Sequence, residues 1–266
     1  MLAAERQSRI LDLLRQRRSA RVGELAQELA VSEVTIRRDL DMLAREDLIS
    51  KVHGGATLPL PAGTEEPGFA AKQHLHQIEK EAIARAAKQL IQPGQAIGLS
   101  AGTTTWTLAH LLRDIPDLTV VTNSPPIATV LSPAPTTTEE SVILTGGVRT
   151  PSDALIGPLA IHALGNFNLD IVFLGVHGMH PDSGYTTPNL GEAETNRAFI
   201  ASAARTVVLA DHTKWSTPGL ARIGSLDIAD VLITDSKLPS AAQETLNESL
   251  ARTGGQLITA VPNGES

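Results

Sequence analysis

The apolar positions near the N-terminus of the chain repeat at the spacing of an amphipathic helix. Residues at i, i+3, i+4 and i+7 form one apolar face, and they are Val22, Leu25, Ala26 and Leu29. Ser32 then suits the N-cap of a second helix, because its hydroxyl can accept hydrogen bonds from first-turn amides. The apolar contacts expected from that second helix are those of Val34, Ile36, Leu40 and Leu43. The stretch from 22 to 46 therefore predicts two short helices joined by a tight turn.

The segments on either side extend this pattern to a small domain. Residues 3–18 form an amphipathic helix whose apolar side holds Ile10, Leu11, Leu13 and Leu14. Residues 47–58 have the character of two short strands around the Gly54-Gly55 turn. An ordinary helical hairpin with a charged, solvated face would also fit the two central helices alone. The strands after them favour a winged helix-turn-helix over residues 1–58, whose second helix would lie in the major groove of DNA.

The pattern changes after residue 58. Residues 59–69 contain three prolines and no periodicity, which predicts an extended linker. Residues 70–91 follow as a helix that Pro93-Gly94 ends. Short apolar strands then alternate with helices to the end of the chain. The strands are expected at 95–100, 118–123, 142–145, 169–175, 207–210, 231–234 and 257–260, and the helices end near residues 112, 131 and 204.

Alternation of this kind defines the fold class as α/β. Strands that follow one another through helical crossovers form a mostly parallel sheet, covered by helices on both faces. Residues 70–266 are therefore expected to form one α/β domain behind the winged helix-turn-helix. Ligands of such sheets bind just beyond the carboxyl ends of the strands, so the residues that follow each strand become the candidates for binding.

Charge is distributed unevenly along the chain. The formal net charge is −7, but the first 55 residues are close to neutral, so the negative charge lies in the remainder. DNA would be repelled by that acidic body, which limits DNA binding to the N-terminal domain. Aromatic residues make up only 3% of the chain, which disfavours binding of single strands by base stacking.

Several classes of function are disfavoured by what the chain lacks. It has no cysteine, which removes disulfides and thiolate chemistry, and no histidine spacing supports a metal site. No motif for a cofactor is present, and none is expected. The N-terminus has no signal-peptide core, and no apolar run approaches the roughly 20 residues that span a bilayer. We expect a cytoplasmic protein that makes no use of a membrane.

Polar residues and glycines follow the predicted strands. The run Ala101-Gly102-Thr103-Thr104-Thr105 would place backbone amides and hydroxyls at a helix N-terminus, which suits a phosphate or another anion. A plain N-cap turn is the alternative. Lys214 could meet the same anion, or it could be an ordinary surface lysine. Asn123 and four glycines also stand at strand ends, where glycines either allow a ligand close to the backbone or only serve turns. These glycines are Gly146, Gly147, Gly175 and Gly178.

The run VSEVTIRRDL, followed at a fixed distance by HGGA, resembles the DNA-binding domain of the DeoR family of bacterial transcription regulators. The resemblance continues through EKEAIARAA, AGTTT, VVTNS, LTGG, LIGPLA, FLGVHG, GYTTPNLGEAE, LADHTK and LITD, and so covers nearly the whole chain. It implies a sensor domain with the fold of sugar-phosphate isomerases and CoA-transferases. The effector that it implies is a phosphorylated sugar or a similar metabolite.

The same resemblance assigns roles to individual residues of the sensor domain. It implies that phosphate is held by Gly102, Thr103, Thr104 and Lys214. It implies that the sugar is surrounded by Asn123, Gly146, Gly147, His177, Gly178 and Glu192. The chain departs from the family pattern at four places: Ser100 replaces a usual Asp, His177 an Asp or Asn, Asn196 a Lys, and Trp215-Ser216 a Phe-Gly. These changes leave the identity of the effector open.

Two other functions remain as alternatives. A sugar-phosphate isomerase with an added helical domain would need a carboxylate base, and Glu192, Glu194 and Asp211 keep that hypothesis open. Ser100 and Asn196 argue against it. A sensor domain that has lost its ligand, and serves only as an oligomerisation scaffold, is the other alternative.

The interpretation that we adopt is a DNA-binding regulator, and a repressor of carbohydrate-metabolism genes. Thr35, Arg37 and Arg38 are expected at base edges, and the arginines between 15 and 21 at phosphates. The full set of expected DNA contacts is Arg17, Arg18, Arg21, Ser32, Glu33, Thr35, Arg37, Arg38, His53 and Gly54. Domains of this size usually bind half-sites as pairs, so a homo-oligomer is expected, either a dimer or a tetramer. Whether the effector releases or promotes DNA binding is open.

Overall fold

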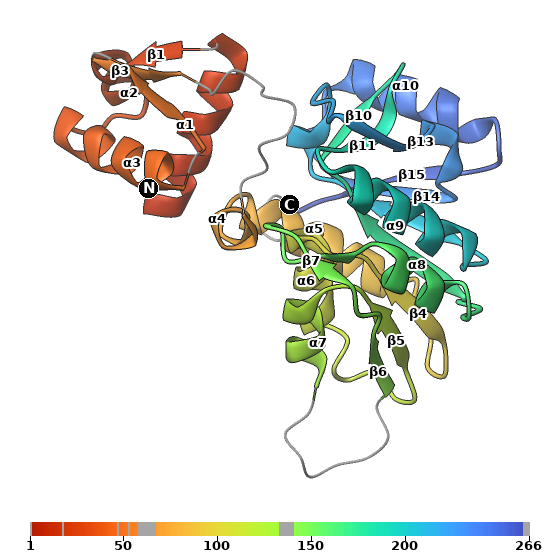
Figure 1. Ribbon diagram of the computed structural model, residues 1–266. Coiled ribbons are helices and arrows are strands. Elements are labelled where there is room, and N and C mark those ends of the chain that lie inside the picture. The colour runs from red at the N-terminus through yellow and green to blue at the C-terminus, as the bar shows by residue number, and fades with distance from the viewer. Residues whose placement is uncertain are drawn as a thin grey trace. The chain divides into compact units, whose positions relative to one another are not determined.

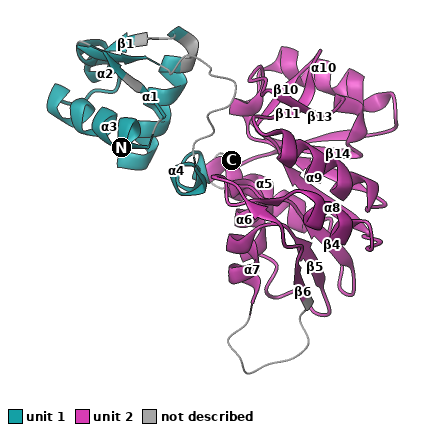
Figure 2. Cartoon of the chain, in the orientation of Figure 1, with its two compact units in different colours: residues 1–77 teal, residues 78–266 magenta. Residues whose placement is uncertain are grey.

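The structure is a computed structural model, and it describes residues 2–17, 19–46, 48–52, 54–57, 68–132 and 141–262. The chain divides into two compact units, Met1–Gln77 and Ile78–Ser266 (Figure 2). The predicted linker at 59–69 falls mostly outside the described residues. Among the helices that the structure describes, none combines the length and the apolar character needed to cross a membrane.

The first unit contains the predicted winged helix-turn-helix (Figure 1). The strand order of its small antiparallel sheet is β1-β3-β2. The strands β2 and β3 form the predicted hairpin, whereas β1 was not predicted, because its three residues carry no apolar alternation. The elements are α1 Ala3–Arg17, β1 Ser19–Arg21, α2 Val22–Glu28, α3 Glu33–Arg45, β2 Ser50–Val52 and β3 Gly55–Thr57.

The core of this unit collects the apolar faces of α1, α2 and α3. Its fully buried members include Ile10, Leu14, Leu25, Ile36 and Leu40. Burial of each such side chain contributes about 1.5–3 kcal/mol, so this core is the main source of the unit's stability. The expectation that Ile36, Leu40 and Leu43 pack inward is confirmed.

Val34 is the exception, because 71% of its side chain is exposed and the expectation that it packs inward is wrong. The reason is geometric. Each residue turns an α-helix by about 100°, so Val34 points more than half a turn away from Ile36, which is buried.

The single helix predicted for 70–91 is also wrong, because two helices occupy this stretch. They are α4 Phe69–Gln73 and α5 Gln77–Lys88. His76, between them, has a φ of +51°, a left-handed conformation that no helix interior tolerates. Leu75 belongs to the core of the first unit, and the Ser8 hydroxyl is 2.9 Å from His76 Nδ1. These tertiary contacts override a helical pattern that the sequence carries without interruption.

A seven-stranded sheet forms the centre of the second unit, with the strand order β15-β14-β12-β9-β4-β5-β6 (Figure 1). Neighbouring strands are all parallel, so each predicted strand is confirmed as part of a parallel sheet. All their carboxyl ends meet at one edge. The strands are β4 Ala96–Leu99, β5 Thr119–Thr122, β6 Ser141–Leu144, β9 Ile171–Gly175, β12 Thr206–Leu209, β14 Val231–Asp235 and β15 Gln256–Ala260.

Helices cover both faces of this sheet, as expected. Successive side chains of a strand point to opposite faces, so Val207 and Leu209 join one core while Val208 joins the other. The first core also contains α5, α6 Thr103–His110 and α7 Pro125–Leu131. The second contains α8 Pro158–Leu164, α9 Leu190–Ala201 and α10 Ser240–Ala251.

Short antiparallel ribbons were not predicted. One joins β7 Val148–Arg149 to β8 Leu155–Ile156, and another has the order β10-β11-β13. The latter strands are β10 Gly178–His180, β11 Gly184–Thr187 and β13 Ala221–Gly224, and the short helices η1 His212–Lys214 and η2 Leu226–Ile228 lie in the same region. Strands of two to four residues are too short to show a period of two, which is why the sequence pattern missed them.

Candidate functional site

The exposed face of α3 carries the side chains that were expected at base edges. Ser32 caps this helix, because its hydroxyl accepts from the Thr35 N–H at 3.2 Å. Arg37 and Arg38 are both exposed. Arg37 forms an ion pair with Glu33 at 3.1 Å, one turn earlier on the same face. The predicted N-cap and the exposure of both arginines leave the start of α3 accessible to a polyanion.

Residues expected at phosphates lie around this helix. Arg17 ends α1 and forms two bonds to the Glu28 carboxylate, at 2.8 and 3.0 Å. Arg21 is exposed, and its backbone N–H donates to Glu24 at 3.1 Å. Arg18 and His53 lie outside the described residues. The structure therefore brings Arg17 and Arg21 to the two ends of β1.

The turn of the wing is attached to the start of α2. Gly54 has a φ of +78°, and its carbonyl accepts from the Val22 N–H at 2.9 Å. On β2, the strand that precedes this turn, Lys51 bonds to Asp41 of α3 at 2.5 Å, and this bond lowers the pKa of the Asp41 carboxyl. The wing is thus linked to both helices of the helix-turn-helix.

A buried ion pair fixes α3 against α1. Arg6 donates through Nε to Asp39 Oδ2 at 2.5 Å and through Nη2 to Oδ1 at 3.2 Å. Asp39 is only 3% exposed, and its hydrogen bond to Arg6 raises the pKa of that guanidinium. A planar, two-point contact of this kind restricts rotation and sliding of α3. The sequence analysis did not identify this pair, since neither residue stands out from a solvated charge pattern.

In the second unit, the carboxyl edge of the sheet is organised around the turn that follows β4. The Ser100 hydroxyl, fully buried, accepts from the Gly175 N–H at 3.0 Å. Asn123, which follows β5, accepts from the Ala101 N–H at 2.8 Å and donates to the Leu155 carbonyl at 3.0 Å. Both groups of the Asn123 amide therefore hold loops in place.

The helix α6 begins at this turn. Gly102 precedes it and offers no side-chain cap, so the first-turn amides keep their capacity to bind an acceptor. Thr103 is half-buried, whereas Thr104 is 6% exposed and Thr105 is fully buried and donates to the Gly102 carbonyl at 2.9 Å. Of the three hydroxyls, that of Thr103 is the most accessible to an anion.

The two glycines after β6 serve the ribbon of β7 and β8. Gly146 has a φ of +73° and Gly147 one of +124°, which side chains rarely adopt. A Cβ on Gly147 would lie 2.5 Å from the Ile156 carbonyl oxygen, so only glycine fits there. These glycines thereby let the ribbon fold back beside Asn123.

Glu192 lies in the first turn of α9 and is held by three hydroxyls. Its Oε1 accepts from Thr150 at 2.8 Å and also from Ser152, and its Oε2 accepts from Thr187 at 2.9 Å. Asn189 caps the same helix by accepting the Glu192 N–H at 3.2 Å. The Glu192 carboxylate therefore ties the loop after β7 to β11 and α9. The three hydroxyl partners carry no motif and were missed.

The remaining predicted residues follow β9, which is next to β4, and β12, which is the strand beyond β9. His177 is half-buried, and its N–H donates to the Thr186 carbonyl at 3.0 Å. Gly178 allows a close backbone approach, since a Cβ there would lie 1.5 Å from the Thr217 oxygen. Lys214 ends η1, where the His212 Nδ1 lies 3.0 Å from the fully buried Asp235. The sequence-predicted residues thus gather at one edge of the sheet, and several of them position loops.

Together, these features define a helix-turn-helix protein with a second, α/β domain that has a polar sheet edge. Comparison with known families agrees with this class. A model described as the DeoR-like helix-turn-helix domain matches residues 6–61, and one described as the DeoR C terminal sensor domain matches residues 75–236. The chain belongs to the DeoR family of transcription regulators.

Individual relatives resemble the chain over most of its length. An uncharacterized HTH-type transcriptional regulator, YulB of Bacillus subtilis, is 36% identical and covers 98% of both chains. The glycerol-3-phosphate regulon repressor of Escherichia coli K12 is 30% identical and covers 93% of this chain and 97% of its own. Among solved structures, a D-ribose-5-phosphate isomerase matches with a TM-score of 0.38 and 16% identity, covering 52% of this chain and 53% of its own.

Proposed function

We propose that the protein is a repressor of carbohydrate-metabolism genes whose affinity for operator DNA changes when a phosphorylated sugar or a related metabolite binds its sensor domain. The exposed face of α3, with Arg37 and Arg38 at the start of a capped helix, is the observation that carries the DNA-binding part. The base-edge role of Thr35, Arg37 and Arg38, and the phosphate role of Arg17 and Arg21, are part of this proposal.

The effector site is proposed at the carboxyl edge of the parallel sheet. The uncapped start of α6 offers amides to a phosphate, and the half-buried hydroxyl of Thr103 adds a donor. Lys214 would supply a positive charge, and His177 and Glu192 would border the sugar. The name of the glycerol-3-phosphate regulon repressor, which is 30% identical, agrees with a phosphorylated effector.

A mobility-shift assay tests both parts of this proposal. The probe is DNA from the region upstream of the protein's own gene, with and without a panel of sugar phosphates and glycerol 3-phosphate. We expect specific binding that one compound alters, by about 5- to 150-fold for a typical coupling of 1–3 kcal/mol. Specific binding that no compound alters would contradict the proposed effector site but would still agree with a DNA-binding regulator. Absence of specific binding would contradict the repressor.

We also propose that the chain is not an enzyme. The isomerase alternative needs a carboxylate that can take a proton from carbon. Of the three candidate carboxylates, Glu192 accepts from three hydroxyls, Asp211 is 1% exposed and its Oδ1 accepts from the Thr213 N–H at 3.0 Å, and Glu194 is exposed on α9. Internal contacts and burial therefore argue against Glu192 and Asp211 as the base. Protein-dependent entry of solvent deuterium into a sugar phosphate, followed by NMR, would contradict this proposal.

A regulator of this class acts on chromosomal DNA, so the proposed location is the cytoplasm. A single helix-turn-helix presents a small interface, and operators commonly hold two half-sites about one helical turn apart. The proposed functional form is therefore a homo-oligomer, either a dimer or a tetramer. Sedimentation velocity of the full chain distinguishes the two from a monomer.

A further inference from the structure

We infer that Val34 is a specificity-determining residue that reads the methyl group of a thymine in the major groove. This inference rests on the proposed DNA binding by α3 and adds one residue to it. Val34 is a large apolar side chain with 71% of its surface exposed. It stands in the first turn of α3, next to Thr35, and the N-terminal residues of a recognition helix are those that meet base edges.

The direction in which Val34 points agrees with this role. Ile36, Leu40 and Leu43 are buried in the core of the first unit and define the inner face of α3. Val34 and Arg38 are four residues apart and share the opposite face. Val34 is therefore placed at the centre of the outward face, on the same line as an exposed arginine.

The immediate surroundings of Val34 are suited to a base edge. Val34, Arg38 and Met42 line a hollow of about 280 Å³ between α3 and the start of α1, and Ala3, Arg6, Thr35 and Asp39 complete its lining. Arg38 brings a positive charge and hydrogen-bond donors, whereas Val34 and Met42 bring apolar surface. Thymine is the base that shows both an acceptor oxygen and a methyl group in the major groove. An apolar side chain beside a guanidinium matches that combination.

An exposed valine has no benefit for the fold of the unit. Exposed single apolar residues are common on protein surfaces, so exposure alone would not distinguish Val34. Its position one turn before Arg37 and Arg38 on the exposed side of α3 does, because DNA that contacts both arginines would lie against that side. Contact with the methyl removes about one methyl group's surface from water, which corresponds to about a fourfold gain in affinity.

The test removes the thymine methyl group and the Val34 side chain one at a time. The probe is the duplex that the wild-type full chain protects upstream of its own gene, with each thymine in turn replaced by deoxyuridine, which lacks only the methyl. We expect one thymine in each half-site whose replacement weakens wild-type binding by about fourfold. Val34→Ala, which removes the contact in both half-sites, should bind the unmodified duplex about 16-fold more weakly and should no longer respond to that replacement.

Two controls accompany this experiment. Val261→Ala, the same substitution at an exposed position of the second unit, should keep the wild-type response to the methyl. Circular dichroism should show that Val34→Ala folds, since the side chain is outside the core. The inference is overturned if no thymine replacement weakens wild-type binding, or if Val34→Ala responds to each replacement as the wild type does. Absence of any protected site would overturn the proposed DNA binding and this inference together.

Discussion

Glu192 shows how a single carboxylate can organise a loop. Each of its oxygens accepts from at least one hydroxyl, and the donors come from the loop after β7 and from β11. Because the carboxylate is half-buried, these bonds are less exposed to competition from water than surface contacts are. Glu192, which was expected to border the sugar, therefore also holds together the loop after β7, β11 and α9 beside the proposed effector site.

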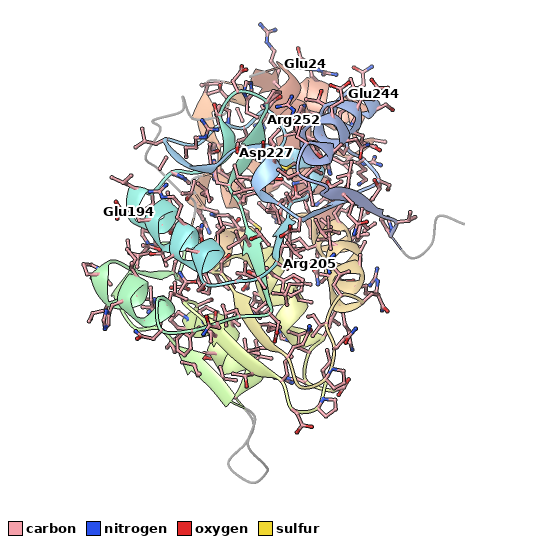
Figure 3. All side chains as sticks on the ribbon, turned by 90° about the vertical axis from the view of Figure 1, so that its right-hand side faces the viewer. Glu24, Glu194, Arg205, Asp227, Glu244 and Arg252 are labelled. Carbon is pink, nitrogen blue, oxygen red and sulfur yellow. The ribbon has the colours of Figure 1, made fainter. Side chains whose placement is uncertain are left out.

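Replacement of the Glu192 carboxylate should weaken the connection between the loop after β7, β11 and α9. In Glu192→Gln, the amide nitrogen cannot accept, so at least one hydroxyl donor loses its partner. We expect a loss of about 1–3 kcal/mol in the free energy of unfolding, measured by urea denaturation. The matched control is Glu194→Gln, two residues along the same helix, where the side chain is exposed on the outer surface (Figure 3). Equal losses in the two variants would contradict the role of the hydroxyl contacts.

Arg37 and Arg17 should differ in what they contribute to DNA binding. Arg37→Ala removes a side chain of α3, and we expect discrimination between operator and unrelated DNA to fall by about 1–3 kcal/mol. Arg17→Ala removes a charge at the end of α1, and we expect weaker binding to every duplex with a salt slope reduced by about one unit. Binding titrations at several salt concentrations measure both. Identical behaviour of the two variants would show that α3 is not the recognition helix.

Individual residues also show which structural features can be predicted from the sequence pattern. The N-cap at Ser32 and the burial of Ile36 and Leu40 were predictable, because both follow from local helix geometry. The exposure of Val34 follows from the same geometry once the phase of the helix is fixed by its neighbours. The two contacts of Asn123 were not predictable, since they join loops that lie 22 and 32 residues away in the chain.

At the scale of elements, α3 depends on a buried ion pair as well as on its apolar face. Asp39 is 3% exposed and binds Arg6 at two points. Loss of this buried carboxylate removes the acceptor of both Arg6 hydrogen bonds, which is more costly than losing a contact between two exposed groups. The orientation of α3, the proposed recognition helix, thus rests on α1 as much as on the turn before it.

Asp39→Asn tests this dependence. We expect a loss of about 1–3 kcal/mol in the stability of the first unit, because the amide that replaces the Asp39 carboxylate can accept a hydrogen bond from Arg6 at only one of the two carboxylate positions. Thermal unfolding followed by circular dichroism measures the effect. Asp41→Asn is the matched control, since Asp41 lies on the same helix and its bond to Lys51 is exposed. A loss in Asp41→Asn as large as that in Asp39→Asn would argue against the buried pair.

The elements that the sequence predicted best are those with the longest apolar pattern. The strands of the parallel sheet are buried on both faces, so they stand out as continuous apolar runs. The ribbon of β10, β11 and β13 does not, because its pairing is set by close backbone approaches at Gly178 and Gly184. Helix α4 ends early for a similar reason, as contacts of Leu75 and His76 override the local pattern.

At the scale of the whole molecule, the division into two compact units separates two kinds of binding. The first unit, Met1–Gln77, has its own apolar core and carries the exposed face of α3. The second, Ile78–Ser266, contains the sheet edge with the proposed effector site. Each unit can therefore be tested for its function by itself.

A fragment of residues 1–77 should fold and bind DNA without responding to metabolites. Its core is small, so we expect a stability of at most about 3–5 kcal/mol and a cooperative thermal transition by circular dichroism. Its affinity for the operator should be lower than that of the full chain, because it lacks the second unit, in which we place most of the contacts of the proposed homo-oligomer. Mobility shifts with the metabolite panel measure this. A fragment that responds to the same metabolite as the full chain would place the effector site elsewhere.

Asn123 has a mechanical consequence for the sensor domain. Its side chain accepts from Ala101, at the turn that starts α6, and donates to Leu155 of β8, while its backbone carbonyl accepts from the Leu155 N–H at 2.7 Å. A small molecule that pulls on the first of these loops must therefore also pull on the second. The amide connects the two loops rigidly. A displacement of the turn before α6 that is too small to change the sheet can therefore still move the ribbon of β7 and β8.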